Sequence, residues 1–321
     1  MKKNSEAIAG YLFAAPWIIG LIVFAAYPIC MSLYYSLCDY SVLTPPVFSG
    51  LHNYQKLFKD SNFYASLFNT VLFALVAVPL GTIVNMSIAM LLNSPHVKGM
   101  SWWRTIFYIP SLVPAVPLAV LGLQLFNADH GLVNIVLHIF TDNGPLHDIG
   151  THLPATGALH DAFHSLGWDT VPAWLSDPRF SKPLLVLLAM WTGGGTVVIY
   201  LAGLQEVPKP LYEAAELDGA TPWQKTVNVT IPLLSPVILF NVIMAIIGSL
   251  QYFTQAYVLF GAGGAPERST YFYAMMMYEN AFSFQKMGYA SAMGWILFII
   301  ILILTVGALK FSEKRVHYEG G

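Results

Sequence analysis

Six long apolar stretches restrict the fold of this chain more than any other feature of its 321 residues. A helix crosses the hydrocarbon core of a bilayer with about 20 predominantly apolar residues. Charged residues make up only 10% of the chain, whereas soluble domains contain about a quarter. We therefore predict an all-α integral membrane protein with about six transmembrane helices. The expected spans are Tyr11–Leu37, Leu67–Leu92, Ile106–Phe126, Pro183–Leu204, Pro236–Phe260 and Ala290–Leu309.

The distribution of lysine and arginine predicts how these spans are oriented. With an inside N-terminus, the inner segments hold nine of these residues and the outer loops hold six. Because positive charge favours the cytoplasmic side, we expect both the N and the C terminus in the cytoplasm. The expected divisions are a first span with its outer loop (1–66), a membrane core (67–310) with a cytoplasmic insert (205–235), and a cytoplasmic tail (311–321).

The charged insert between the fourth and fifth stretches has the pattern of a helical hairpin. Leu211–Asp218 is rich in helix-forming residues, and Gly219 suits the position that follows a helix. Thr221 is placed to cap a second helix, and Gln224 completes a capping box. We expect Pro232 to end that second helix. These patterns equally support a projection that docks on a partner and a connector that lies at the lipid headgroups.

The insert also resembles the EAA motif of permeases from binding-protein-dependent ABC importers. Glu213-Ala214-Ala215, Gly219 and Ile231-Pro232 match that motif, although Val229 and Ile231 replace its usual isoleucine and leucine. Further similarity lies in the stretches RTIFYIPSLVP, WLSDP, LAGLQEVP and MGYASA. Together these stretches are similar to the carbohydrate-importing subset of the family, which includes maltose and glycerol-phosphate importers.

The resemblance implies a type I ABC importer permease fold and a non-catalytic role in a multi-pass protein of a bacterial or archaeal cytoplasmic membrane. Its implied partners are a second, distinct permease, two ATPase subunits, an extracytoplasmic solute-binding protein, a carbohydrate, and lipid, with no nucleic acid. ATP and Mg would be bound by the ATPase subunits, and this chain would hold no cofactor or metal. The residues implied to couple to the ATPase are Glu213, Ala214, Ala215, Glu216, Asp218 and Gly219.

Polar side chains inside the apolar stretches indicate a substrate path, because such residues usually face the interior of a helix bundle. Asn241, Gln251, Tyr252 and Gln255 have a spacing that predicts one stripe on a single helix. Amides beside an aromatic ring suit a sugar, and we add Trp191, Ser291 and Trp295 as candidates for the same lining. The alternative is that the amides only tie helices together. Residues Gly193-Gly194-Gly195 suggest close helix packing, or an unwound helix at a binding site.

Several other functions find no support in the sequence. It contains no phosphate-binding G-x-x-x-x-G-K-[ST] motif and no recognisable catalytic constellation, so we expect no ATP hydrolysis by this chain. The histidines between His130 and His164 match no metal-site pattern, and we interpret them as solvated loop residues. A secondary transporter that works alone is the alternative function. It would need acidic residues within the membrane, whereas Asp and Glu lie almost entirely in the expected loops.

Overall fold

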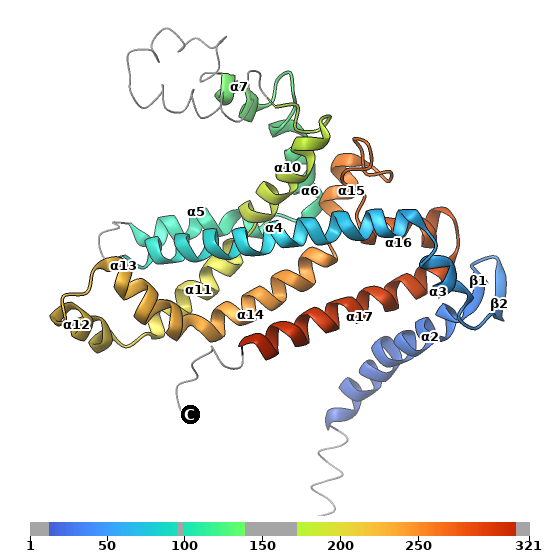
Figure 1. The fold of residues 1–321 in the computed structure, drawn as a ribbon, viewed down its shortest axis with the longest axis horizontal. Helices are drawn as coiled ribbons and strands as arrows, with labels where there is room; N and C mark the ends of the chain where they lie inside the picture. Colours follow the sequence, from blue (N-terminus) through green and yellow to red (C-terminus); the bar gives the residue numbers. More distant parts are fainter. Residues whose placement is uncertain (1–12, 95–98, 139–171, 313–321) are drawn as a thin grey trace, which may run out of the picture. The chain divides into compact units, whose positions relative to one another are not determined.

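The computed structural model describes residues 13–94, 99–138 and 172–312, and most of them are helical (Figure 1). The chain forms two compact units. The first consists of Met1–Tyr64 with Met276–Ile300, and the second of Ala65–Met275 with Ile301–Gly321. Three helices, α4 (Ser61–Leu92), α16 (Tyr273–Tyr278) and α17 (Met287–Ser312), contribute residues to both units.

Among the described residues, four helical segments are long and apolar enough to cross a membrane. They are Phe13–Ser36, Ser61–Leu92, Pro222–Phe260 and Met287–Ser312. Two further pairs of helices meet the same criterion together but are bent, α5 (Met100–Leu112) with α6 (Ala115–Leu125) and α10 (Pro178–Trp191) with α11 (Gly194–Glu206). If each bent pair is counted as one span, the protein has the six spans that the sequence predicts.

The bend between α5 and α6 reaches 101°. Val113 and Pro114 between them have extended ψ angles of 123° and 149°. The cause is local, because a residue that precedes proline is disfavoured in the helical region. With 13 and 11 residues, α5 and α6 extend only about 20 and 16 Å, so neither alone crosses a core about 30 Å thick.

The first unit contains the N-terminal span, which includes η1 (Ile22–Ala26) and α2 (Tyr27–Ser36), and the loop that follows it. That loop forms a small antiparallel hairpin of β1 (Cys38–Ser41) and β2 (Thr44–Phe48), followed by α3 (His52–Leu57). The buried Asn53 donates hydrogen bonds to the carbonyl oxygens of Ser36 (3.0 Å) and Cys38 (2.8 Å). The segment η3 (Glu279–Ser283) also belongs to this unit.

The core of the second unit is packed from three helices of different spans. α4 contributes Met86, Ala89 and Leu92, α11 contributes Val197 to Leu204, and α14 (Ile231–Leu250) contributes Leu234. Figure 1 shows α11 and α14 running side by side, and the two helices are in contact. Because these helices are fixed against one another, the polar side chains on their inner faces have defined neighbours.

The segments before α10 are tied to this unit by polar contacts. Trp174 Nε1 donates to Asn134 Oδ1 of α7 (Leu132–His138) at 2.8 Å, and both residues are buried. Asp177 caps α10 by accepting from the Arg179 backbone N–H at 2.8 Å. The hydrogen bonds from the Arg179 side chain and backbone lower the pKa of the Asp177 carboxyl. The WLSDP stretch therefore begins the fourth span.

Candidate functional site

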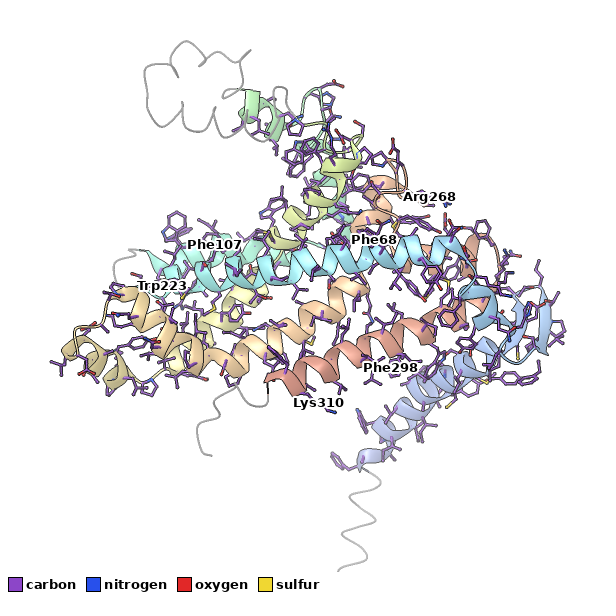
Figure 2. The ribbon with its side chains drawn as sticks, in the orientation of Figure 1. Phe68, Phe107, Trp223, Arg268, Phe298 and Lys310 are labelled. Carbon is purple, nitrogen blue, oxygen red and sulfur yellow. The ribbon has the colours of Figure 1, made fainter. Side chains whose placement is uncertain are left out.

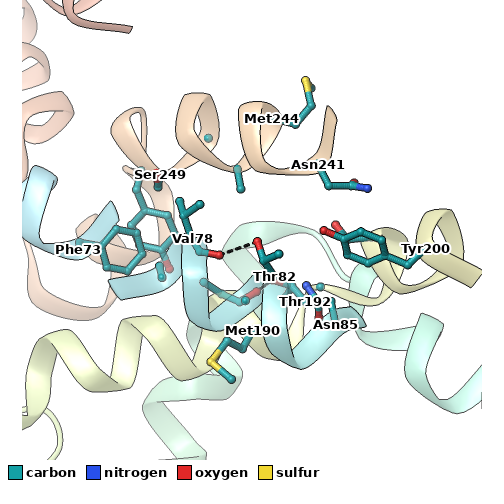
Figure 3. A pocket seen from close by; sticks show the side chains of 18 residues that line it. Phe73, Val78, Thr82, Asn85, Met190, Thr192, Tyr200, Asn241, Met244 and Ser249 are labelled. Atoms are coloured by element: carbon teal, nitrogen blue, oxygen red, sulfur yellow. Dashed lines mark hydrogen bonds between the residues drawn. The ribbon is translucent and has the colours of Figure 1, made fainter. Parts of the chain in front are cut away.

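A cavity of about 390 Å³ lies within the second unit, where α4, α10, α11 and α14 meet (Figure 3). Helices from the second, fourth and fifth spans contribute its lining. The lining residues are Phe73, Ala77, Val78, Gly81, Thr82, Asn85, Ala189, Met190, Thr192, Gly193, Thr196, Tyr200, Asn241, Met244, Ala245, Gly248, Ser249 and Tyr252. Its volume falls in the range of about 300–1,000 Å³ that is common for small-molecule sites.

The polar groups of the cavity are amides and hydroxyls, and several already bond to their own helix. Thr82 Oγ1 donates to the Val78 carbonyl at 2.8 Å, as Figure 3 shows. Asn241 Nδ2 donates to the Val237 carbonyl at 2.9 Å. Asn241 is therefore fixed by its own helix, which leaves its amide oxygen to accept a hydrogen bond.

Two tyrosines, Tyr200 and Tyr252, place their hydroxyls in the same lining. Both hydroxyls are inaccessible to solvent, and that of Tyr252 has no hydrogen-bond partner within the described part of the chain, whereas that of Tyr200 meets the side chain of Thr82. A buried hydroxyl without a partner costs about 1–3 kcal/mol.

Only two of the predicted path residues, Asn241 and Tyr252, line this cavity. The prediction of one continuous stripe is wrong, because α14 ends at Leu250 and the chain is non-helical until α15 (Thr254–Phe260) begins. Gln251 is exposed at that break and Gln255 lies on the next helix, so neither is part of the lining. Trp191 ends α10 with 45% of its surface exposed and also lies outside the lining.

The other two path candidates, Ser291 and Trp295, belong to the first unit. They line a different, more apolar groove of about 530 Å³ with Ile29 and Ser32. Trp295 Nε1 donates to Ser32 Oγ at 3.2 Å, which joins α17 to α2. A hydrogen bond of this kind ties two helices together.

Sequence reasoning missed the contribution of α4 to the cavity. Thr82 and Asn85 lie three positions apart in an otherwise apolar stretch, and this spacing puts them on one helix face. The same argument that selected Asn241 would have selected them. The buried carboxamide of Asn85 lies directly against Gly193, where a Cβ atom would overlap it.

The glycine triplet Gly193–Gly195 shows both an interruption of the helix and close helix packing. The fourth span bends by 47° between α10 and α11, at Thr192 and Gly193, beside the cavity. Close packing occurs at the same place, because a Cβ on Gly194 would overlap the backbone oxygen of Phe107 on α5. A Cβ on Gly195 would meet nothing within 4 Å. Gly193 and Gly194 are thus required for packing, and Gly195 is not.

The second candidate site is the helical hairpin predicted in the charged insert. It consists of α12 (Lys209–Leu217) and α13 (Pro222–Lys225). Gly219 between them has a left-handed φ of 74°, which glycine adopts without strain. The predicted capping box is confirmed, with Thr221 N–H donating to Gln224 Oε1 at 2.7 Å and Gln224 N–H to Thr221 Oγ1 at 3.3 Å.

The prediction that Pro232 ends the second helix is wrong. α13 continues through the π-helical turn η2 (Thr226–Thr230) into α14, and Pro232 lies in the first turn of α14. A π turn is wider than an α turn, so the helix accommodates a proline whose ring and missing N–H would otherwise interrupt it. Consequently the second helix of the hairpin continues without interruption from Pro222 to Leu250, within the candidate span Pro222–Phe260.

The surface of the hairpin of α12 and α13 is largely exposed. Every residue of α12 is at least partly exposed, and Leu217 and Trp223 expose 89% and 74% of their surface. Glu213 is exposed, whereas Glu216 Oε1 pairs with Lys225 Nζ at 2.7 Å across the hairpin. Tyr212 Oη lies 2.9 Å from Thr230 Oγ1, and this bond ties α12 to η2. Figure 2 shows Trp223 at this end of the second unit.

The histidines of the long outer loop fall into two groups. His130 and His138 belong to the described part of the chain, whereas the rest of the group up to His164 lies within 139–171, outside the described residues. The interpretation of those histidines as solvated loop residues therefore stays a prediction. Among the described residues, no cluster of three or more His, Cys, Asp or Glu side chains could hold a metal ion.

A multi-pass helical protein with a cavity lined by uncharged residues, several of them amides and hydroxyls, and an exposed hairpin on one of its spans has the features of a membrane transport subunit. The family model "Binding-protein-dependent transport system inner membrane component" matches residues 77–318. The chain belongs to this family of inner-membrane ABC transporter permeases.

Relatives of known name support the assignment over the whole chain. The chain is 33% identical to the probable ABC transporter permease protein YesP of Bacillus subtilis (99% of this chain, 96% of the relative). It is 30% identical to the lactose transport system permease protein LacF of Rhizobium radiobacter (98% and 96%). A solved bacterial ABC transporter involved in import of the acidic polysaccharide alginate shares the fold, with a TM-score of 0.77, 20% identity and coverage of 98% and 99%.

Proposed function

We propose that this chain is the transmembrane permease subunit of an ATP-driven importer and forms part of the path for a carbohydrate, in particular an oligosaccharide. Relatives about 30% identical over nearly the whole chain are permeases for lactose, for arabinooligosaccharides and for starch degradation products. A related solved structure was determined with a sugar-bound periplasmic protein. The partners in this proposal are a second, distinct permease, two ATPase subunits that bind ATP and Mg, and an extracytoplasmic solute-binding protein.

The observation that carries the proposal is the helical continuity between hairpin and cavity. The continuous helix from Pro222 to Leu250 begins in the hairpin and carries Asn241 and Gly248 at the cavity, and Tyr252 follows its end. A displacement of the hairpin by an ATPase would therefore move the cavity lining, because a packed helix transmits a shift along its length. The capping box, the Glu216–Lys225 ion pair and the Tyr212–Thr230 bond stiffen the hairpin for this role.

In this proposal Glu213, Ala214, Ala215, Glu216, Asp218 and Gly219 contact the ATPase. The hairpin lies on the cytoplasmic side, together with both termini. Asn241 and Tyr252 belong to the sugar path. Gln251, Gln255, Trp191, Ser291 and Trp295 stay predictions for other parts of that path, which the second permease would complete.

The experiment changes Ala215→Asp and Gly219→Pro in the complete complex. Ala215 is half-buried within the hairpin, so a charge there would disturb the docking surface, and proline cannot adopt the positive φ of Gly219. We expect loss of at least about tenfold in sugar-stimulated ATPase activity, which corresponds to about 1.4 kcal/mol of coupling. Membrane insertion should be normal.

Gly307→Ala on α17 offers a control, because a Cβ there meets nothing within 4 Å and the position lies outside both the hairpin and the described lining of the cavity. ATPase activity and permease content of the membrane are measured together. Full sugar-stimulated activity in both hairpin variants would contradict the coupling role.

A further inference from the structure

The groove of about 530 Å³ in the first unit lies between the first and the sixth span. Ile29 and Ser32 of the N-terminal span line one side of it, and α16 and η3 contribute one residue each. The remaining lining comes from α17, namely from Met287, Ala290, Ser291, Gly294, Trp295 and Phe298. These α17 residues recur at intervals of three or four positions, so they occupy a single face of that helix.

The groove extends over the depth of one membrane leaflet. Met287 and Phe298, the latter labelled in Figure 2, lie about 16 Å apart along α17 at about 1.5 Å per residue. Half of a hydrocarbon core about 30 Å thick is about 15 Å. Ile29 and Ser32 belong to the last third of the candidate span Phe13–Ser36, so both spans contribute from the same leaflet. In the proposed orientation this is the outer leaflet.

The chemistry of the groove suits an apolar occupant. No described lining residue is ionisable, and the polar side chains are those of Ser32, Ser291 and Trp295. Ser32 Oγ donates to the Ile29 carbonyl at 2.8 Å and accepts from Trp295 Nε1 at 3.2 Å. A ligand rich in hydroxyls would therefore lose hydrogen bonds with water and regain few. Within a bilayer van der Waals fit decides what fills such a groove, and an acyl chain of the same leaflet has the matching length and polarity.

A cation lies at the headgroup end of the groove. Lys286 directly precedes Met287, is exposed, and forms no ion pair within the described part of the chain. Its backbone N–H donates to the Asn280 carbonyl at 2.7 Å, which fixes the turn that carries it. Its ammonium lies 5.3 Å from the centre of the exposed Phe284 ring. A lysine at the end of a span extends its ammonium among the lipid headgroups, where phosphate groups supply a counter-charge.

From these observations we propose that the groove binds one acyl chain of an outer-leaflet phospholipid and that Lys286 pairs with the phosphate of that lipid. The bound lipid adds to the Ser32–Trp295 hydrogen bond in joining the first span to the sixth. Lys286 favours a phospholipid over an apolar helix of the second permease, because such a helix offers no counter-charge. The inference goes beyond the proposed function, and it differs from a sugar-path role for Ser291 and Trp295.

The test uses the purified complete complex in detergent with a trace of phosphatidylglycerol that carries a diazirine on one acyl chain. Illumination attaches this probe to the residues that surround the chain, and peptide mass spectrometry locates the attachment. The competitors are unlabelled phosphatidylglycerol and phosphatidylethanolamine, a diglucosyl diacylglycerol with the same chains but no phosphate, and maltotriose.

Two variants alter the two parts of the site. Gly294→Leu fills the groove, because a Cβ there meets only the Met277 sulfur, at 3.7 Å. Gly307→Leu is its matched control on the same helix, since a Cβ there meets nothing within 4 Å and the position lies outside the described lining. Lys286→Gln removes the cation, and Lys59→Gln removes another exposed lysine of the first unit as its control.

We expect label on the peptide that contains Met287–Phe298 in the wild type and in both controls. Gly294→Leu should reduce this label at least about tenfold, because the leucine occupies the space of the chain. Lys286→Gln should reduce it about fivefold, the effect of one basic residue on an anionic lipid. The two phospholipids should compete at least about fivefold better than the diglucosyl lipid, and maltotriose should not compete.

The proposal is overturned if the wild-type groove takes up no label, the result expected where the second permease covers it. Wild-type labelling of Gly294→Leu also overturns it, as does competition by maltotriose, which would return Ser291 and Trp295 to the sugar path. Wild-type labelling of Lys286→Gln, or equal competition by the diglucosyl lipid, overturns the phosphate contact. If Gly294→Leu does not assemble, Lys286→Gln and the competitors decide, because they leave the groove unaltered.

Discussion

Gly194 is the residue at which the packing of α11 on α5 is tightest. A Cβ there would overlap the backbone oxygen of Phe107, and a backbone atom cannot move aside by changing a rotamer. We expect Gly194→Ala to destabilise the protein by about 1–3 kcal/mol, the usual cost of overpacking. Gly195→Ala is the control, because the same methyl group meets nothing within 4 Å and alanine is the better helix former. Thermal unfolding in detergent measures both. Equal unfolding midpoints for the two variants would show that the close approach of Gly194 to Phe107 does not affect stability.

At the scale of elements, the hairpin allows its internal ion pair to be separated from its contacts with a partner. Glu216 and Lys225 expose 62% and 21% of their side chains, so their pair contributes at most about 1 kcal/mol. The double change Glu216→Lys with Lys225→Glu restores an internal pair but reverses the charge offered to the ATPase. We expect unchanged thermal stability and reduced sugar-stimulated ATPase activity, by about tenfold if Glu216 meets a cation across a desolvated interface. If the double variant is as active as the wild type while each single variant is impaired, Glu216 acts only through its ion pair with Lys225, which stabilises the hairpin.

The same elements show what could be predicted from the sequence. The capping box of Thr221 and Gln224 was predictable, because it depends on residue types at a short, fixed spacing. The continuation of the helix past Pro232 was not, because a π turn has no comparable signature in the sequence. The break after Leu250 likewise divides a stripe that the spacing places on one helix. Sequence patterns within one helical turn therefore predict local structure in this chain. Whether a helix continues or breaks at the next turn depends on tertiary packing.

For the whole molecule, apolar length predicted the number of spans but not their bends. Hydropathy over the third and fourth stretches is the same whether a helix is straight or bent by 101° or 47°. The cavity was only partly predictable for a related reason. Its lining comes from three spans, and a sequence does not show which faces of different helices meet. Asn241 and Tyr252 were found because they are polar residues in an apolar stretch, and Thr82 and Asn85 carry the same signal.

The orientation of the chain is the prediction that applies to the whole molecule. Leu217 in the hairpin and Glu267 in the loop after α15 lie at opposite ends of the helical segment Pro222–Phe260, and both are exposed. If that segment crosses the membrane and the positive-inside rule holds, Leu217 faces the cytoplasm and Glu267 the outside. We replace Cys30 and Cys38 by alanine, so that Leu217→Cys or Glu267→Cys supplies the single thiol.

A membrane-impermeant maleimide should then label Glu267→Cys in intact spheroplasts and Leu217→Cys in inside-out vesicles. The two positions control for each other, because every preparation contains one that is expected to react and one that is protected. The reverse pattern would place the hairpin outside the cell, where an ATPase subunit that uses cytoplasmic ATP could not reach it. That result would contradict the orientation and, with it, the coupling role of the hairpin.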